Sequence, residues 1–287
     1  MTWSGGDEGM TVLRWAARVA QWRSVRAVAA VILVLAVCVG EIVHEPRLAH
    51  NPVFAGDVVV FYPEHPDDEV LWGGSAIRAA IDTKGADNVY VVLVSRGLGA
   101  TPFLKPAHFN ALSSVQRGTL REDEFRAAMA ALGFESRNVV VLQDSAPGPD
   151  DNFAEMRRTA LTFERAAAAA GRTVTHVAHS YVLDNNRLHR GNGRVIKSLL
   201  DEGLITDALF WIKPEFRYNV PAGDLVRFQA LTPVDSAAVH AAINAYTRTE
   251  PRAGLEAIGF RSTPWYFWML EWDANLTSLL HTAAVPG

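Results

Sequence analysis

The sequence lacks several features that would narrow its class at once. It has one cysteine, Cys38, among 287 residues, so no disulfide can form within the chain. Its 27 Lys and Arg residues against 31 Asp and Glu give a net charge of -4, which argues against nucleic acid as a partner. No internal repeat is present, which argues against a solenoid or a propeller. A chain of this length with 49% hydrophobic residues has enough apolar surface for one large domain.

Long hydrophobic runs are also missing, with one exception near the N-terminus. Residues 27–40 are all apolar or small, residues 42–43 extend the run past Glu41, and four arginines precede it. A basic front followed by a short apolar stretch is typical of a secretory signal or a signal anchor. Residues 27–43 reach the lower limit of about 17 residues for a membrane span, and the alternative is a buried core helix. We expect an uncleaved single-pass anchor, with the following domain outside the cytoplasm by the positive-inside rule.

The composition divides the chain into a basic region at 1–26, the expected transmembrane segment at 27–43, a linker at 44–56 and a domain at 57–287. In the domain, apolar strands alternate with helical segments, which predicts an α/β, Rossmann-like fold whose mostly parallel sheet has helices on both faces. We expect strands at 58–62, 89–95, 139–142 and 174–179, and helices at 70–82, 118–132, 153–170 and 191–201. Beyond residue 204 we expect short antiparallel strands at 210–212 and 216–218 and a helix at 236–247.

The most informative stretch is Glu64-His65-Pro66-Asp67-Asp68-Glu69, which directly follows the first expected strand. In α/β folds, ligands bind in the crevice at the carboxyl ends of the strands. His65 and Asp68, three residues apart on a tight loop, can hold one divalent metal, and Asp67 stays free to act as a base. The alternative is that these acids only cap a helix that begins near Val70.

This stretch resembles the His-Pro-Asp-Asp-Glu signature of the LmbE-like, or PIG-L, metal-dependent deacetylases. Two further segments are similar to the family: residues 91–97, as its second strand and glycine-containing loop, and residues 121–133, as its Arg-x-x-Glu helix ending in Leu-Gly. The resemblance covers about residues 57–200.

The resemblance implies zinc, or another divalent metal, held by His65, Asp68 and His189, with Asp67 as the general base. Three nitrogen and oxygen ligands leave a position open for water, as in catalytic zinc sites. The family acts on N-acetylated sugars, usually N-acetylglucosamine, so the implied function is removal of an N-acetyl group from such a sugar. Two alternatives stay open: a zinc amidase acting on a larger amino-sugar conjugate, and a catalytically idle member that binds glycans.

The sequence departs from the family at its last motif, where His-x-Asp-His is replaced by Asn186-Arg187-Leu188-His189. Asn186 stands where the family has the His that helps the oxyanion, and an amide can donate a hydrogen bond to developing negative charge. Leu188 stands where an Asp would steady the ligand His189, and Asp184 is the candidate to replace it.

Two arginines are candidates for binding the substrate's hydroxyls or phosphate, Arg96 and Arg121; a surface ion pair with Glu122 or Glu124 is the other interpretation of Arg121. His176 and His179 lie on one expected strand and face opposite sides, and His179 is either near the site or an ordinary core histidine. Residues 265–272 hold three Trp, one Tyr and one Phe. They predict a sugar-stacking wall, a membrane-interface contact or a segment packed on the core.

Overall fold

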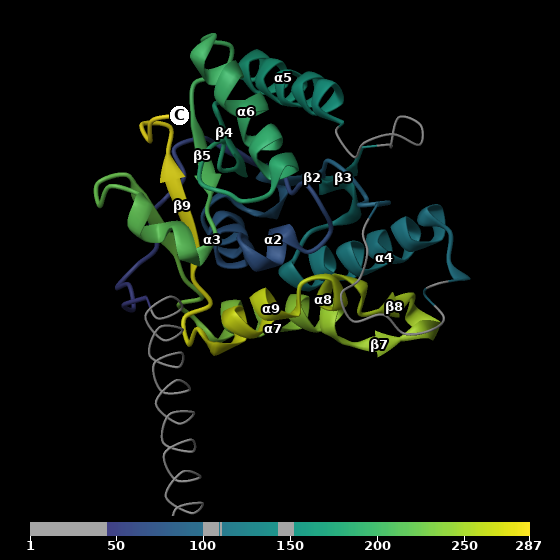
Figure 1. The fold of residues 1–287 in the computed structure, drawn as a ribbon. Helices are drawn as coiled ribbons and strands as arrows, with labels where there is room; N and C mark the ends of the chain where they lie inside the picture. The colour runs from purple at the N-terminus through teal and green to yellow at the C-terminus, as the bar shows by residue number, and fades with distance from the viewer. Residues whose placement is uncertain (1–44, 100–108, 110, 143–151) are drawn as a thin grey trace, which may run out of the picture. The chain divides into compact units, whose positions relative to one another are not determined.

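A seven-stranded mixed sheet organises the part of the chain that the computed structural model describes, which comprises residues 45–99, 109, 111–142 and 152–287 (Figure 1). The strand order is β3-β2-β1-β4-β5-β9-β6. Five neighbouring strands are parallel, namely β1 (Val58–Phe61), β2 (Val89–Leu93), β3 (Val139–Val141), β4 (Val174–His179) and β5 (Ala208–Trp211). The next strand, β9 (Ser278–Thr282), runs antiparallel to both β5 and β6 (Leu225–Phe228).

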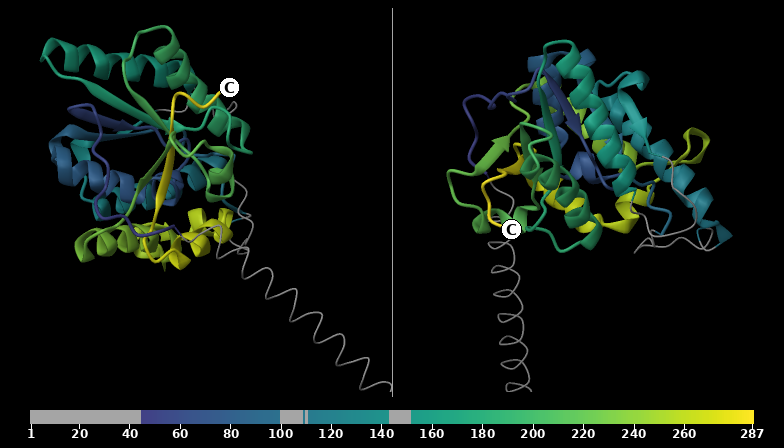
Figure 2. Two further views of the ribbon diagram at one scale, coloured as in Figure 1. Left: turned by 90° about the vertical axis from the view of Figure 1, so that its left-hand side faces the viewer. Right: turned by 90° about the horizontal axis from the view of Figure 1, so that it is seen from above.

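Helices cover both faces of this sheet, as the alternating pattern predicts. One side carries α3 (Gly74–Lys84), α4 (Ser114–Leu132) and α7 (Pro233–Thr247), and the other carries α5 (Phe153–Ala169) and α6 (Arg187–Asp201) (Figure 2). The shorter elements are α2 (Asp68–Leu71), α8 (Ile258–Ser262), α9 (Pro264–Trp272) and the two-stranded pair β7 (Thr249–Glu250) and β8 (Leu255–Glu256). The expectation of a mostly parallel α/β sheet with helices on both faces is confirmed.

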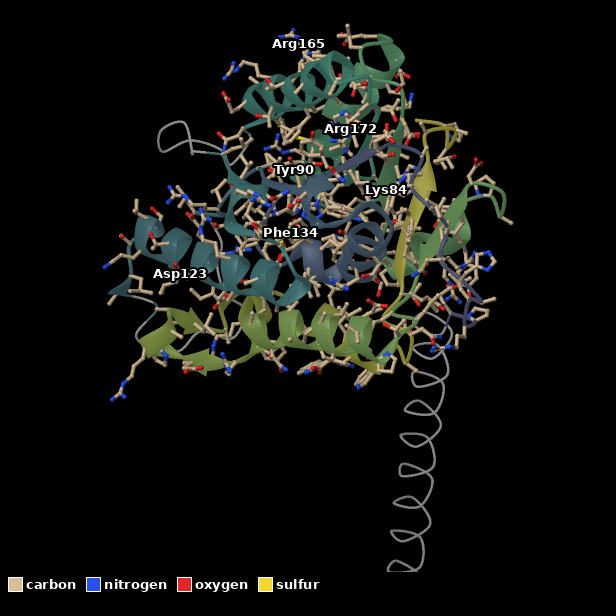
Figure 3. All side chains as sticks on the ribbon, turned by 180° about the vertical axis from the view of Figure 1, so that it is seen from behind. Lys84, Tyr90, Asp123, Phe134, Arg165 and Arg172 are labelled. Carbon is tan, nitrogen blue, oxygen red and sulfur yellow. The ribbon has the colours of Figure 1, made fainter. Side chains whose placement is uncertain are left out.

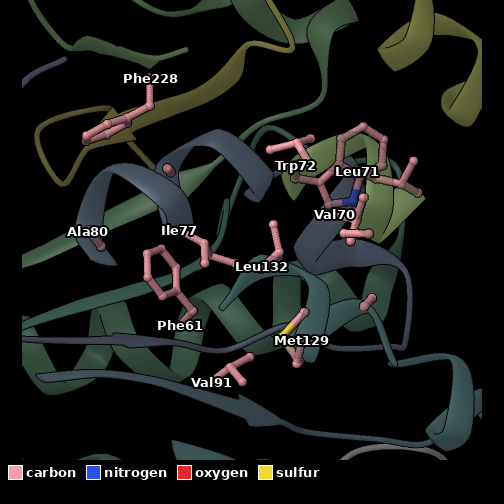
Figure 4. Close-up of a cluster of buried hydrophobic side chains, with 14 of the residues drawn as sticks. Phe61, Val70, Leu71, Trp72, Ile77, Ala80, Val91, Met129, Leu132 and Phe228 are labelled. Atoms are coloured by element: carbon pink, nitrogen blue, oxygen red, sulfur yellow. The ribbon is translucent and has the colours of Figure 1, made fainter. Parts of the chain in front are cut away.

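The alternation of side chains along each strand divides the core into two layers. Phe61 and Val91 point into the cluster beneath α3 and α4, together with Ile77 and Met129 (Figure 4). Val60, one residue from Phe61, points into the cluster beneath α5 and α6. Because successive strand residues face opposite sides, a continuous apolar run is what a strand buried on both faces needs.

Several elements differ from the sequence-based expectation. The single helix expected at 70–82 is two helices, α2 and α3, separated at Trp72 and Gly73, where a Cβ on Gly73 would lie 2.6 Å from the Trp211 ring. Helix α6 begins at Arg187, before the expected residue 191. The strand expected at 216–218 is wrong, because these residues lie in a 3-10 helix that begins at Pro214, a residue suited to the first turn of a helix. The strand at 210–212 is present as β5, but it pairs in parallel with β4 and is antiparallel only to β9.

The described residues of the expected linker, 45–56, pack against the strands at the β6 edge. The Glu45 carboxylate accepts hydrogen bonds from Arg217 at 2.5 Å and Arg227 at 2.6 Å. The Phe54 ring stacks on Phe228 with their centroids 4.6 Å apart. Within the ranges that the structure describes, we find no helix with the length and apolar character needed to cross a bilayer. The expected anchor at 27–43 lies outside these ranges, so it stays a prediction.

The two ends of the parallel strands differ in chemistry. At the amino ends lies Arg172 (Figure 3). Its guanidinium donates to the Asp57 carbonyl at 3.1 Å and to Asn88 Oδ1 at 2.8 Å. At the carboxyl ends, the chain turns from β1 toward β2 and β3 on one side, and later from β4 toward β5 on the other. Such a reversal between neighbouring strands opens a crevice at their carboxyl ends, where α/β proteins bind ligands.

Candidate metal centre and active site

The polar residues singled out in the sequence meet at this reversal between β1 and β4. His65 and Asp67 lie in the turn that connects β1 to α2, and Asp68 is the first residue of α2. His189 comes from the first turn of α6, which follows β4. Helix α6 packs closely against the end of β4 because residue 193 is glycine. A Cβ at this position would lie 2.2 Å from the His179 carbonyl oxygen.

Three side-chain atoms form a nearly equilateral triangle. His65 Nδ1 lies 3.5 Å from Asp68 Oδ2, His189 Nε2 lies 3.4 Å from the same oxygen, and the two nitrogens are 3.3 Å apart. Ligand atoms held about 2.0–2.1 Å from zinc at tetrahedral angles are about 3.3 Å from one another. The triangle therefore has the size that a tetrahedral metal site requires, and its three members are the residues that the sequence predicts.

The Asp68 carboxylate is held in place from several sides. The indole Nε1 of Trp72 donates to Oδ1 at 3.0 Å, and the backbone N–H of His65 donates to Oδ2 at 2.8 Å. His179 Nε2 lies 3.2 Å from Oδ2. Although burial raises the pKa of Asp68, the neighbouring His189 and His179 outweigh it and hold this pKa well below its ordinary value. The carboxylate is thus ionised and oriented, as a metal ligand must be.

The His189 ring is oriented by Asp184. Its Nδ1 lies 3.0 Å from Asp184 Oδ2, and Asp184 Oδ1 in turn lies 3.0 Å from the ammonium of the buried Lys213. The hydrogen bond from His189 overcomes the effect of burial and keeps the pKa of Asp184 below its ordinary value. A carboxylate only accepts hydrogen bonds, so Nδ1 carries the proton and the lone pair of Nε2 points into the triangle.

A second group of possible ligands is present among the described residues: His179, Asp184 and His189. The rings of His179 and His189 stack with centroids 4.0 Å apart and planes 23° apart. Since nitrogen lone pairs lie in the ring plane, stacked rings direct them side by side and not at a common point. The triangle of His65, Asp68 and His189 is therefore the better metal site.

Asp67 occupies an unusual backbone conformation beside the triangle. Its φ is 114°, a region that side-chain-bearing residues rarely adopt. Its N–H donates to the carboxyl of Glu69 at 3.2 Å, and its Oδ2 accepts from Arg121 at 3.2 Å. Burial raises the pKa of Asp67 well above its ordinary value, while the Arg121 guanidinium acts in the opposite direction. The result is a carboxyl group with raised basicity next to the candidate metal ligands.

Arg121 is buried and points toward Asp67, not along the surface of α4. It also donates to the Pro66 carbonyl at 2.6 Å, so the surface ion pair considered for it is wrong. It reaches this place because residue 97 is glycine, with φ at 65°, where a Cβ would lie 2.7 Å from the guanidinium. The carboxyl of Glu69 supports the same loop, since it accepts from the Tyr246 hydroxyl at 2.5 Å, and burial raises its pKa to about 8.

Asn186 is the N-cap of α6, where its Oδ1 accepts the N–H of Leu188 at 2.9 Å. This hydrogen bond identifies which amide atom is oxygen. The Nδ2 group is therefore available as a donor, and Asn186 lines the cavity in front of the triangle.

The cavity has a volume of about 390 Å³. Beside the metal triangle and Asp67 it is lined by residues from well-separated parts of the chain, including Leu71, Arg121, Asn186, Lys213, Thr263 and Tyr266. Arg96 is not among the described residues that line it, and its guanidinium lies 3.9 Å from Glu122. Of the two arginines expected to bind substrate, only Arg121 reaches the cavity.

The C-terminal side of the cavity depends on a buried carboxyl group in α4. Glu124 accepts the backbone N–H groups of Glu256, Ile258 and Gly259 at 3.1, 2.7 and 2.9 Å. Burial raises its pKa to about 7, against the lowering effect of these hydrogen bonds. Glu124 thereby fixes the start of α8, whose end and the following α9 bring Thr263 and Tyr266 to the cavity.

Some residues near the cavity carry no signal in the sequence that we recognised, namely Trp72 and Lys213. Lys213 lines the cavity together with Tyr266, and its ammonium lies 5.7 and 5.5 Å from the ring centroids of Trp72 and Tyr266. Tyr266 belongs to the aromatic stretch 265–272, for which a sugar-stacking wall was one of the interpretations. The role of Glu124 had a partial signal, because it belongs to the Arg-x-x-Glu pattern that we compared with the family. His179, for which both a site and a core interpretation were open, lies beside the Asp68 carboxylate, while His176 faces Tyr62 on the other side of the sheet.

Residues 59–197 match the family model described as PIG-L, GlcNAc-PI de-N-acetylase. Among curated proteins, the chain is 35% identical over 72 residues to a glycerol kinase of Pediococcus pentosaceus, and this match covers 25% of the chain and 14% of the kinase. So short a match carries nothing of the kinase's activity over.

Solved structures with a similar fold include the N,N'-diacetylchitobiose deacetylase of Pyrococcus horikoshii, with a TM-score of 0.49, 15% identity and coverage of 79% of this chain and 84% of the deacetylase. The antimicrobial pseudoaglycone deacetylase Dbv21 has a TM-score of 0.48 and 16% identity, covering 79% and 96%. The 4-carboxy-2-hydroxymuconate hydratase of Pseudomonas putida has a TM-score of 0.47 and 16% identity, covering 78% and 94%.

Proposed function

Because residues 59–197 belong to the PIG-L family of de-N-acetylases, we propose that this chain is a metal-dependent hydrolase that removes the acetyl group from an N-acetylglucosamine-type sugar. The observation that carries the proposal is the triangle of His65, Asp68 and His189, with edges of 3.3 to 3.5 Å. The Asp67 carboxyl group lies beside this triangle and is not one of its three members.

The donor set fits zinc. Two imidazole nitrogens and one carboxylate oxygen are the ligands of many catalytic zinc sites, and Asp184 supplies the outer partner that such a histidine ligand requires. When bound there, zinc would lower the pKa of a water molecule and polarise the amide carbonyl. Another divalent metal that accepts the same ligands would provide the same chemistry.

Asp67 acts as the general base. Its carboxylate takes a proton from the attacking water as the new carbon–oxygen bond forms, and returns it to the nitrogen as the carbon–nitrogen bond breaks, which yields acetate and a free amine. Burial raises its pKa, which suits a group that must both accept and release a proton. Arg121 keeps the carboxylate in place through its contacts to Asp67 and Pro66.

Asn186 donates from Nδ2 to the carbonyl oxygen as negative charge develops on it, in the place of the histidine found in the family. Arg121 and Arg96 were both expected to bind the substrate. In this structure Arg121 is committed to the base, and we assign it the role of positioning Asp67. Arg96 lies outside the cavity lining, so the cavity gives no support to its assignment.

One alternative uses the same site. An amidase acting on a larger amino-sugar conjugate would need the same metal ligands and base, and the cavity of about 390 Å³ is wide enough to keep this possibility open. The idle glycan-binding alternative rested on two departures from the family, Asn186 and Leu188. Asp184 is the partner of His189 that Leu188 cannot be, so Leu188 does not favour an idle protein. Asn186 lines the cavity and keeps an amide donor there.

Two substitutions test the proposal in the full chain. His189→Ala removes a ligand and should abolish both bound zinc and acetate release from a panel of N-acetylated sugars. Asp67→Asn should keep the zinc and lower acetate release about 10²- to 10⁴-fold, the contribution of a general base. His240→Ala, at an exposed position of α7, is the matched control and should change neither. Unchanged acetate release in His189→Ala would overturn the assignment. If the unmodified protein hydrolysed only larger amino-sugar conjugates, and His189→Ala lost that hydrolysis, the amidase would be favoured.

The location of the protein is a proposal from the sequence alone. Residues 27–43 would anchor the chain as a single span, with the arginines in the cytoplasm and the domain outside. Protease treatment of intact cells or of sealed vesicles tests this, since only an exposed domain would be digested.

A further inference from the structure

Helix α9 has two faces of different character. Phe267, Met269 and Leu270 are buried in the protein, and Phe267 and Leu270 belong to the main core cluster. Trp265, Trp268 and Trp272 are 45, 41 and 56% exposed. Spacings of three and four residues place the three side chains on one side of the helix. We call these three residues the tryptophan ridge.

Each tryptophan of the ridge contacts another aromatic ring. The rings of Trp265 and Trp272 meet edge to face with centroids 5.8 Å apart, and Trp268 contacts Phe260 of α8 at 6.0 Å. Isolated exposed apolar residues are normal, but three exposed tryptophans on one side of a short helix mark a contact surface. Tryptophan favours the boundary between water and lipid, where its ring is in an apolar medium and its N–H remains hydrated.

The described chain begins beside this helix. The Asn275 amide, three residues beyond Trp272, donates to the Glu45 carbonyl at 2.9 Å, and Arg47 donates to Asn275 Oδ1 at 3.4 Å. Residue 45 is therefore fixed next to the end of α9. It lies two residues after the apolar run 27–43, the segment of the sequence with the strongest membrane character. A chain held in a bilayer through that run would leave the membrane within a few residues of this point.

We propose that the tryptophan ridge contacts the lipid–water boundary of a bilayer and orients the cavity toward the membrane surface. The same short segment carries both features, because Thr263 and Tyr266 line the cavity while Trp265 and Trp268 face outward. Helix α9 has no Lys or Arg and carries Glu271, so the contact rests on the aromatic rings and not on attraction to anionic lipid. It should therefore be insensitive to salt and to lipid charge.

The test uses the full chain with Cys38→Ser, which removes the natural cysteine, and one introduced cysteine that carries an environment-sensitive dye. Trp268→Cys places the dye on the ridge. The control is Leu204→Cys, which follows α6 on the other face of the sheet and has 44% exposure, close to that of Trp268. Both proteins are reconstituted into phosphatidylcholine vesicles with or without bromine on the upper part of the acyl chains.

Bromine should quench the dye at position 268 by about twofold and leave the dye at 204 nearly unchanged, at low and at high salt, as expected for contact with the lipid–water boundary. Equal signals at the two positions would overturn the proposal. If the ridge instead joined two copies of the chain, bromine would not quench the dye, and the unmodified protein would form a dimer. The triple variant Trp265→Gln/Trp268→Gln/Trp272→Gln would then be a monomer. A ridge that stacks on sugar would give no quenching and a raised KM for soluble substrate in this triple variant. The quenching requires no hydrolysis, so it stays readable if the proposed activity is wrong.

Discussion

Replacement of Asp184 by asparagine tests the orientation of the metal ligands most directly. The carboxylate makes three contacts: Oδ2 with His189 Nδ1 at 3.0 Å, and Oδ1 with the Lys213 ammonium at 3.0 Å and the Asn186 N–H at 2.6 Å. Asp184→Asn keeps an oxygen for the Asn186 N–H. It places an NH₂ group against His189 Nδ1, so that this nitrogen must accept and the proton moves to Nε2.

A protonated Nε2 has no lone pair for a metal, so binding requires breaking the new hydrogen bond or turning the amide. Loss of an outer partner of this kind costs about 10- to 100-fold in metal affinity, or about 1.4 to 2.7 kcal/mol. Lys213, which is 5% exposed, also loses the negative charge of its partner, while its contact of 2.5 Å to Asn185 and its two aromatic neighbours remain. The upper part of that range is therefore the better expectation.

Competition for zinc with a chromophoric chelator measures the change. Asp224→Asn is the matched control, because Asp224 accepts a hydrogen bond from Thr282 at 2.8 Å and is not among the cavity-lining residues. It should leave zinc affinity unchanged. If Asp184→Asn bound zinc within about twofold of the unmodified protein, Asp184 would not orient His189 and our account of Leu188 would fail.

Two further predictions concern the loop at Gly97 and the buried His281. Gly97→Ala adds a Cβ 2.7 Å from the Arg121 guanidinium, at a φ of 65°. Because this displaces Arg121, we expect kcat to fall at least about tenfold while the zinc content stays unchanged. An unaltered kcat would exclude Arg121 as a positioning residue. Burial lowers the pKa of His281 to about 4, against the raising effect of the Thr282 carbonyl. The folded state thus stays neutral while the unfolded chain takes up a proton, and stability falls as the pH drops from about 6.5 to about 4, by about 2 kcal/mol at pH 5. His281→Gln should lose this component, measured as the change in urea unfolding free energy between pH 7.5 and pH 5 in variant and unmodified protein; equal changes in both would contradict it.

The sequence predicted the parts of the fold and site that depend on local patterns. Apolar runs identify β1 and β4 because both faces of these strands are buried, and His65 and Asp68 are recognisable because a short turn presents both. His189 was found through its resemblance to a family motif, and not from spacing.

The remaining parts arise from contacts between distant segments. Lys213 reaches Asp184 only because β5 lies beside β4, and Trp72 reaches Asp68 only because the chain breaks between α2 and α3. That break accommodates the Trp211 ring against Gly73, which no local pattern indicates. The 3-10 helix at 214–219 was a different kind of miss, because Pro214 is a local signal for a helical first turn that we did not weigh.

The backbone at Asp67 has a consequence for how the chain tolerates change. A residue with a side chain at a φ of 114° costs on the order of 1–3 kcal/mol, and glycine would remove most of that cost. In Asp67→Gly this relief of strain opposes the loss of the ion pair with the buried Arg121, so the substitution costs less stability than the loss of a buried ion pair elsewhere and leaves a folded protein without its base. Any effort to stabilise this chain must therefore keep Asp67 and gain stability from substitutions at other positions.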